Sequence, residues 1–85
     1  MKYSVYILQS EKDGSYYIGY SQDLIKRLEQ HNSSKSGYTA TKNPWKMVYV
    51  EEYETKTEAI KREKFLKRQR NKAFYKTLIE GSNIN

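Results

Sequence analysis

The sequence contains no cysteine, so disulfide bonds and thiolate-bound zinc or iron–sulfur clusters are excluded. Any metal ion must be bound by oxygen or nitrogen atoms. Long apolar runs are also missing: the longest, Val5–Leu8 and Met47–Val50, have four residues each, whereas a membrane span needs roughly 20. No signal-peptide core follows the charged start of the chain. We expect a soluble, cytoplasmic protein with no membrane partner.

The chain has 85 residues, which allow one domain with a modest core. We expect this domain to span 1–81 and 82–85 to form a frayed tail. The formal net charge is +6, and residues 61–76 carry eight basic side chains with one acid, Glu63. That segment therefore carries +7 and the rest of the chain −1. Such concentration favours a nucleic-acid backbone as partner over a solvated helix face.

Alternation of side chains predicts three strands. β-Branched and aromatic runs place them over 3–8, 16–20 and 45–53. The polar stretch with Asp13-Gly14 predicts a turn that joins the first two strands into a hairpin.

Helical spacing and capping residues predict three helices, over 22–31, 56–70 and 72–80. Their expected signals are Ser21 as the first N-cap, Thr55-x-x-Glu58 as a capping box and Gly81 as the last stop. Residues 32–44 show no period and predict a loop. The order β-β-α-β-α-α predicts an α+β fold, in which helices flank a three-stranded, mainly antiparallel sheet.

Glu63 occupies an unusual place on the second predicted helix. At about 100° per residue, it falls within the apolar stripe that contains Ala59 and Leu66. An unpaired carboxylate buried there is costly, so a cation should meet it. One alternative is a local ion pair with Lys67 or Arg70, worth under about 1 kcal/mol if exposed. The other is a divalent cation, because Mg²⁺ is commonly held by a carboxylate, water and phosphate oxygens.

Arg27 and His31 present the same ambiguity on the first predicted helix. They are four residues apart, so they share a face, and that face borders the apolar stripe of Leu24 and Leu28. A single histidine is more often packed than catalytic, and an arginine at a core edge can extend its charged end to solvent. Position alone leaves both interpretations open.

Together these residues match a known pattern. Ser4-Val5-Tyr6 and Tyr17-Ile18-Gly19 resemble the two halves of the GIY-YIG nuclease signature, with serine in place of the first glycine. Arg27, His31 and Glu63 match further catalytic positions of that family, in order and on the expected elements. The resemblance covers nearly the whole chain. The sequence is similar to the small stand-alone bacterial branch of the family, and this branch is related to the N-terminal nuclease domain of a bacterial excinuclease.

The resemblance implies hydrolysis of a phosphodiester bond with one divalent metal. Glu63 would hold Mg²⁺ or Mn²⁺, and Arg27 would stabilise the charge that grows on the phosphate. Tyr6 is the leading general base, Tyr17 would help to position water, and His31 would orient a tyrosine or relay a proton. Free tyrosine has a pKa of about 10, so Arg27 and the metal would have to favour the phenolate.

Two further expectations concern placement. Strand parity puts the Tyr6 and Tyr17 hydroxyls on one side of the sheet, together with the helix that bears Glu63. Three residues outside the catalytic set are expected to contact the nucleic-acid backbone: Lys67, Arg70 and Tyr38, the last from the loop.

We therefore expect an endonuclease that acts on DNA rather than RNA, in repair or processing of branched or single-stranded DNA. A catalytically idle nucleic-acid-binding module of the same fold, or a basic domain that docks an acidic protein, would present the same positive surface. Only the nuclease predicts metal-dependent nicking that is lost in Glu63→Gln or Arg27→Ala while salt-dependent binding remains.

Overall fold

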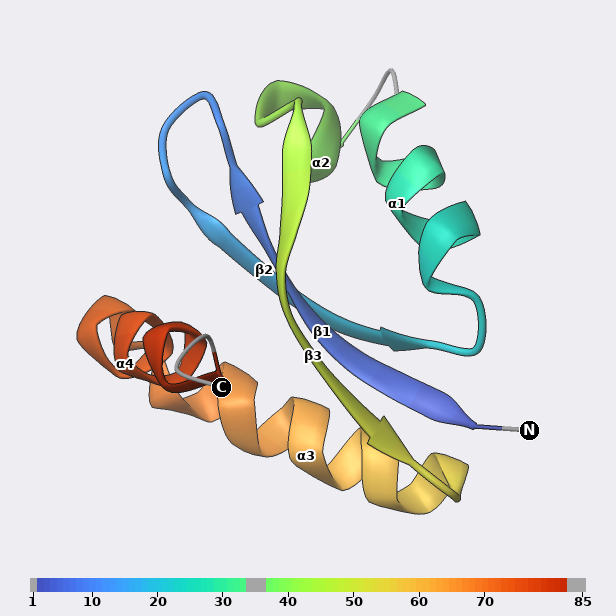
Figure 1. Ribbon diagram of the computed structural model, residues 1–85. Coiled ribbons are helices and arrows are strands. Elements are labelled where there is room, and N and C mark those ends of the chain that lie inside the picture. Colours follow the sequence, from blue (N-terminus) through green and yellow to red (C-terminus); the bar gives the residue numbers. More distant parts are fainter. Residues whose placement is uncertain (1, 34–36, 83–85) are drawn as a thin grey trace.

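An antiparallel sheet with the strand order β2-β1-β3 forms the centre of the protein (Figure 1). The computed structural model describes residues 2–33 and 37–82. The strands are β1 (Tyr3–Ser10), β2 (Tyr16–Ser21) and β3 (Trp45–Tyr53). The predicted hairpin turn is confirmed, because Gly14 has a positive φ of 79° and donates its amide to the Ser10 carbonyl. The strands β2 and β3 are thus the two edges of the sheet.

Helices cover both faces of the sheet, which confirms the α+β class. In Figure 1, α1 (Leu24–Ser33) and α2 (Tyr38–Thr41) lie on one side, and α3 (Lys56–Gln69) and α4 (Lys72–Ser82) lie on the other. Thr55 is confirmed as the N-cap of α3, because its hydroxyl oxygen accepts a hydrogen bond from the Glu58 amide at 3.2 Å. Its hydroxyl also donates to the Glu58 carboxylate at 3.0 Å. None of the helices within 2–33 and 37–82 is long and apolar enough to cross a membrane.

Several element boundaries differ from the sequence prediction, and three of the differences have a clear local reason. The N-cap of α1 is Asp23, whose carboxylate accepts from the Lys26 amide at 3.0 Å, whereas Ser21 caps the preceding turn by accepting from the Asp23 amide. The segment predicted as a loop contains α2, a helix of four residues, too short to show an apolar period. α4 continues through Gly81 to Ser82, because glycine weakens a last helical turn without ending it.

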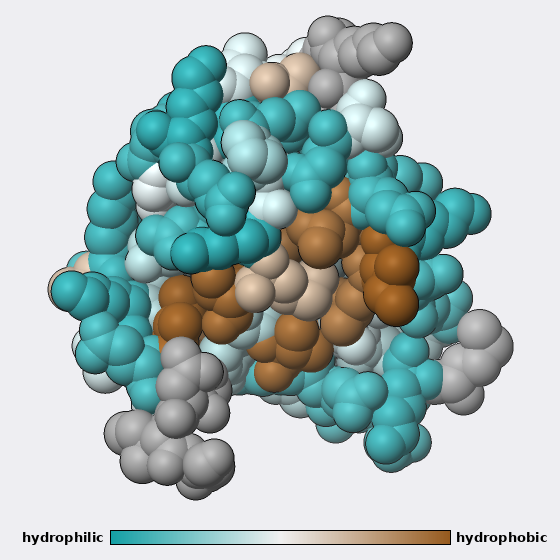
Figure 2. All heavy atoms as spheres, turned by 45° about the horizontal axis from the view of Figure 1, so that its top comes forward, coloured by the Kyte–Doolittle hydropathy of each residue, from teal (hydrophilic) through white to brown (hydrophobic). Residues whose placement is uncertain are grey.

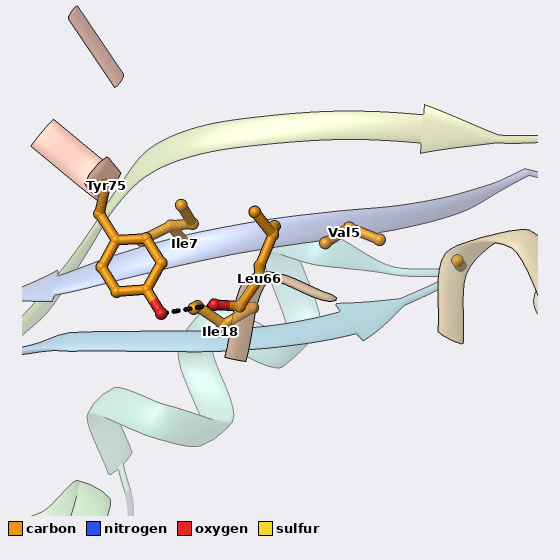
Figure 3. Packing of buried hydrophobic residues seen from close by; sticks show 6 residues of the cluster. Val5, Ile7, Ile18, Leu66 and Tyr75 are labelled. Carbon is orange, nitrogen blue, oxygen red and sulfur yellow. Dashed lines mark hydrogen bonds between the residues drawn. The ribbon is translucent and has the colours of Figure 1, made fainter. Parts of the chain in front are cut away.

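Two hydrophobic clusters fill the two faces. Side chains of α3 and α4 pack on one face of β1 and β2, where Tyr75 donates its hydroxyl proton to the Leu66 carbonyl (Figure 3). The buried members of this cluster are Val5, Ile7, Ile18, Ala59, Leu66 and Tyr75. On the other face Tyr6, Leu8 and Trp45 pack with α1. The tyrosines of the motif therefore belong to the face that α1 covers.

A polar cluster fastens α3 to β3. Glu51 accepts two hydrogen bonds from the Arg62 guanidinium, at 2.8 and 2.9 Å, one from Tyr53 at 2.7 Å and one from Tyr49. Burial by itself would raise the pKa of Glu51, but the hydrogen bonds from Arg62, Tyr49 and Tyr53 together hold it below its ordinary value. The folded state thus favours the ionised carboxylate.

Glu51→Gln should lower the free energy of unfolding by about 2 kcal/mol at pH 7, because Arg62 loses a half-buried charged partner. A lowered carboxyl pKa stabilises the fold above the unfolded value and loses that effect as pH falls through the folded value. The difference between variant and wild type should therefore shrink in acid. Urea unfolding at pH 7 and pH 3 measures it, with Glu52→Gln on the same strand as control. A difference independent of pH would contradict this account.

The surface carries both apolar and hydrophilic side chains. Figure 2 shows apolar side chains gathered in the middle of one face, with hydrophilic side chains around them. Among the described residues, the large hydrophobic side chains that are exposed are Ile25, Val50 and Phe65. Small apolar areas of this kind are ordinary on protein surfaces, so these side chains do not by themselves mark a binding site.

Candidate active site

A cleft of about 500 Å³ opens at the β2 edge of the sheet. Four of the five residues predicted to be catalytic line it: Tyr6, Tyr17, Arg27 and Glu63. They come from β1, β2, α1 and α3, so only the tertiary fold brings them together. A phenol pair, a guanidinium and a carboxylate in one cleft form a set that can bind a phosphate and its counter-ion.

Gly19 allows Tyr6 to reach this cleft. The two residues are directly paired across β1 and β2, and a Cβ built on Gly19 would lie 2.5 Å from the Tyr6 hydroxyl oxygen and 2.8 Å from its Cζ. The Tyr6 ring therefore lies across the backbone of the edge strand, where only glycine leaves room. The glycine of the second motif half is thus required by the tyrosine of the first.

Gly19→Ala should displace the Tyr6 ring and cost about 1–3 kcal/mol of stability, as overpacking does. It should also reduce any activity that depends on the Tyr6 hydroxyl. Gly81→Ala is the matched control, because nothing lies within 4 Å of its added methyl group. Thermal unfolding of both variants tests the claim, and equal stability of Gly19→Ala and wild type would contradict it.

Glu63 enters the cleft from an unexpected direction. Tyr6 and Tyr17 do share one side of the sheet, as predicted, but α3 packs against the opposite face, on the cluster that includes Ile18 and Leu66. The expectation that the helix bearing Glu63 lies on the tyrosine side is therefore wrong. Glu63 lines the cleft at the β2 edge, where a sheet has no further strand to separate its two faces.

The carboxylate of Glu63 also has a local partner. Lys67 Nζ lies 3.7 Å from Glu63 Oε1, with 52% of the lysine side chain and 14% of the glutamate side chain exposed. The ion pair that the sequence allowed thus exists, with Lys67 rather than Arg70. At this distance it is not a hydrogen bond, and the exposed lysine makes it a weak pair. The negative charge of Glu63 is therefore only partly compensated by Lys67.

His31 lies behind the tyrosines rather than in the cleft. Its Nε2 is 3.4 Å from the Tyr6 hydroxyl oxygen, and its ring centroid is 4.5 Å from that of Tyr17. The side chain of Asn32 holds this end of α1 on β3, accepting from the Trp45 amide at 2.6 Å and donating to its carbonyl at 3.1 Å. His31 therefore packs against both phenols at the end of α1.

The electrostatics of the buried groups favour their neutral forms. Burial, followed by the effect of Tyr17, raises the pKa of Tyr6 to about 12, although Arg27 acts in the lowering direction. The expectation that Arg27 favours the phenolate is right in sign, but burial outweighs it when no metal ion is present. Burial and the Arg27 charge also lower the pKa of His31, so its imidazole is neutral at pH 7.

The predicted nucleic-acid contacts divide into two groups. Lys67 and Arg70 line a second cleft, of about 440 Å³, which shares Tyr17 with the first. The side chain of Tyr38 lies outside the described residues, so that prediction is not tested.

Several residues that line the first cleft were not predicted from the sequence. They include Tyr3, Tyr20, Asp23 and Lys56. No pattern in the sequence singles them out, because each matches the strand or helix end it belongs to. Gly19 did carry a signal, since a glycine within a strand often marks a place where another group lies close to the backbone.

Metal binding would rest on few protein ligands. Within the described ranges no three His, Cys, Asp or Glu side chains come together as a metal cluster. Glu63 contributes a carboxylate to a cleft with room for water and phosphate oxygens. Mg²⁺ usually keeps several waters and takes one or two carboxylates plus substrate phosphates, so the residues present fit such an ion.

Comparison with known proteins shows the family to which the chain is related. The protein-family model described as GIY-YIG catalytic domain matches residues 2–77 of this sequence. A UPF0213 protein of Staphylococcus saprophyticus is 40% identical over 81 residues, covering 94% of this chain and 98% of the relative. A UPF0213 protein of Streptococcus pneumoniae is 39% identical over 82 residues, covering 95% of this chain and 82% of the relative.

A solved structure shows the same fold. The solution NMR structure of a UPF0213 protein from Bacillus halodurans superposes with a TM-score of 0.58 at 32% identity, and the match covers 94% of this chain and 84% of that one. The family match extends over the strands and helices that build the cleft. The chain therefore belongs to the GIY-YIG catalytic-domain family.

Proposed function

We propose that this protein is an endonuclease that hydrolyses phosphodiester bonds in DNA with the help of Mg²⁺ or Mn²⁺. Membership of a nuclease family supports the general class. The observation that carries the proposal is the convergence of Tyr6, Tyr17, Arg27 and Glu63 on one cleft. Tyr6 and Tyr17 also pack in the cluster with Trp45, but packing does not account for the guanidinium and the carboxylate that line the same cleft.

Each residue has a physical role in this proposal. Glu63 would hold the metal ion, which neutralises charge on the phosphate and the leaving oxygen when it is bound. The forked donors of Arg27 stabilise the charge that develops on the phosphate oxygens. Arg27 is exposed at the cleft, so a phosphate can reach its guanidinium.

The proton of the attacking water would pass to Tyr6. The Tyr6 hydroxyl can donate to Nε2 of neutral His31, 3.4 Å away, which leaves its oxygen lone pairs free to accept from water. As Tyr6 takes the water proton, its own proton can move to His31. Tyr17, which lines the cleft and packs on the imidazole, would position the water. Tyr6 therefore acts as base without having to be a phenolate beforehand.

A binding module without turnover is the second candidate. The ion pair between Lys67 and Glu63 favours it, since an ammonium already partly neutralises the carboxylate that would hold the metal. The two proposals share the fold and the positive surface, and they differ only in whether DNA is cut.

The test is incubation of the purified protein with supercoiled, branched and single-stranded DNA, with Mg²⁺, with Mn²⁺ or with a chelator. We expect nicking that requires the metal. Salt-dependent binding of all substrates without any cutting would favour the binding module. Failure to bind nucleic acid even at low salt would exclude both proposals and favour an acidic protein partner.

A further inference from the structure

The second cleft lies between β2, the end of α3 and the start of α4. Its lining includes Tyr16 and Ile18 on the strand, and Lys67, Arg70 and Lys72 on the helices. Its volume, about 440 Å³, falls in the range of about 300–1,000 Å³ that small-molecule sites occupy. It is therefore a hollow that a ligand group can enter.

The chain bends sharply at this cleft and presents cations there. Arg70 ends α3 in a left-handed conformation with φ 45°, and Asn71 caps α4 by accepting from the Ala73 amide at 2.9 Å. The bend is held by Tyr75, whose hydroxyl accepts from the Arg70 amide at 3.2 Å. Both helix ends are thus fixed, and the basic side chains extend from a rigid frame.

The charge in this cleft is not neutralised locally. Within 2–33 and 37–82, Arg70 and Lys72 form no ion pair, while Lys67 forms only the weak pair with Glu63. The cleft thus has a cationic rim and walls made of tyrosine and isoleucine. An anionic group joined to a flat ring, as in a nucleotide, matches this combination better than a simple anion does.

The two clefts share a lining residue. Tyr17 lines both of them, and the ion pair joins Glu63 in the first to Lys67 in the second. A strand whose phosphate lies in the first cleft would reach the second with a neighbouring nucleotide. We propose that the second cleft binds an unpaired nucleotide next to the bond that is cut, with its phosphate on Arg70 and Lys72 and its base against the aromatic wall.

This inference rests on the proposed function for the role of the first cleft, and it adds the substrate class. A base that is paired in a duplex is stacked and held by its partner, so it cannot enter the hollow. The protein should therefore prefer DNA with a single-stranded segment beside the bond that is cut. The preference comes from the shape of the cleft and not from a reading of base sequence.

Binding without metal tests the proposal separately from cutting. The probe is a fluorescein-labelled oligothymidylate of eight nucleotides, titrated with the full chain by anisotropy at several salt concentrations. The variant is Arg70→Gln with Lys72→Gln. Its control is Lys61→Gln with Lys64→Gln, which removes the same charge from exposed positions on α3 that line neither cleft. Circular dichroism verifies that both variants fold.

We expect the cleft variant to bind about 10- to 30-fold more weakly and its salt slope to fall by about 1.4, the value for two lost contacts on a single strand. The control should lose less than about 3-fold. A blunt duplex of the same length should show no such difference between the two variants. If both variants lose the same affinity for the oligothymidylate, the attraction is diffuse and the proposal is overturned. The proposal is also overturned if the cleft variant loses as much affinity for the duplex as for the single strand.

The outcome is independent of the proposed activity. If the cleft variant loses binding but wild type cuts nothing, the second cleft is a nucleotide site and the nuclease proposal fails. If wild type cuts and the cleft variant binds and cuts like the control variant, the nuclease proposal survives and the second cleft is not the site.

Discussion

Replacement of Glu63 by glutamine should reduce DNA nicking by roughly 10³-fold, because metal-ion stabilisation of a phosphate contributes several kcal/mol to the transition state. Glutamine keeps the size of the side chain and its place in the cleft but removes the charge that would hold a divalent cation. DNA binding should persist or rise slightly, since a negative charge leaves the cleft and Lys67 loses its ionic partner. Initial nicking rates of supercoiled plasmid and anisotropy titrations measure the two effects.

The matched control for this experiment is Glu80→Gln. Glu80 also pairs with a lysine four residues away on its helix, Lys76, at 4.0 Å, but it is exposed and lines neither cleft. Loss of an exposed pair of that kind should change stability by under about 1 kcal/mol and leave nicking unchanged. If Glu63→Gln nicks within tenfold of wild type, Glu63 does not hold the metal ion. If Glu63→Gln and Glu80→Gln lose the same nicking activity, the effect comes from removal of a helix carboxylate in general and not from the cleft.

Replacement of Arg27 by lysine should also disable the site, with a loss of about 10²-fold in nicking rate. Lysine retains the positive charge but offers a point charge in place of the planar fork that fits phosphate oxygens. Removal of the whole side chain in Arg27→Ala should cost about 10²–10³-fold, as the loss of one donor to a developing oxyanion does. The comparison of the two variants separates charge from geometry.

Arg68→Lys and Arg68→Ala are the controls for Arg27. Arg68 is exposed on α3 and lines neither cleft, so its variants should nick normally and lose at most one phosphate contact in salt-dependent binding. Full activity of Arg27→Lys would mean that a point charge suffices. Full activity of Arg27→Ala would remove Arg27 from the catalytic set.

The chain order of strands and helices was predictable because it depends on local periodicity. The alternation in β1 and β2, and the N-cap at Thr55, are properties of a few neighbouring residues. The boundaries were less certain: α1 begins after Asp23 rather than Ser21, because either side chain can cap a helix and only the turn geometry decides. The one-turn helix α2 is too short to carry a period.

Four of the residues that line the first cleft were named from the sequence, because they match a family motif. Their arrangement was not predictable. Whether α3 lies on the tyrosine face depends on which face of the sheet its apolar stripe buries, and strand parity does not contain that information. The same holds for the role of Gly19, which depends on its register with Tyr6.

The sequence by itself thus determined the elements, the concentration of positive charge and the kinds of side chain available for chemistry, because these follow from local spacing and composition. Tertiary structure alone decided that Glu63 and Tyr6 line one cleft at the β2 edge, that burial keeps Tyr6 protonated, and that a second cleft shares Tyr17 with the first. The physical reason is that burial, cross-strand contact and cleft shape arise between residues far apart in the chain, and they exist only after the sheet and its helices have packed.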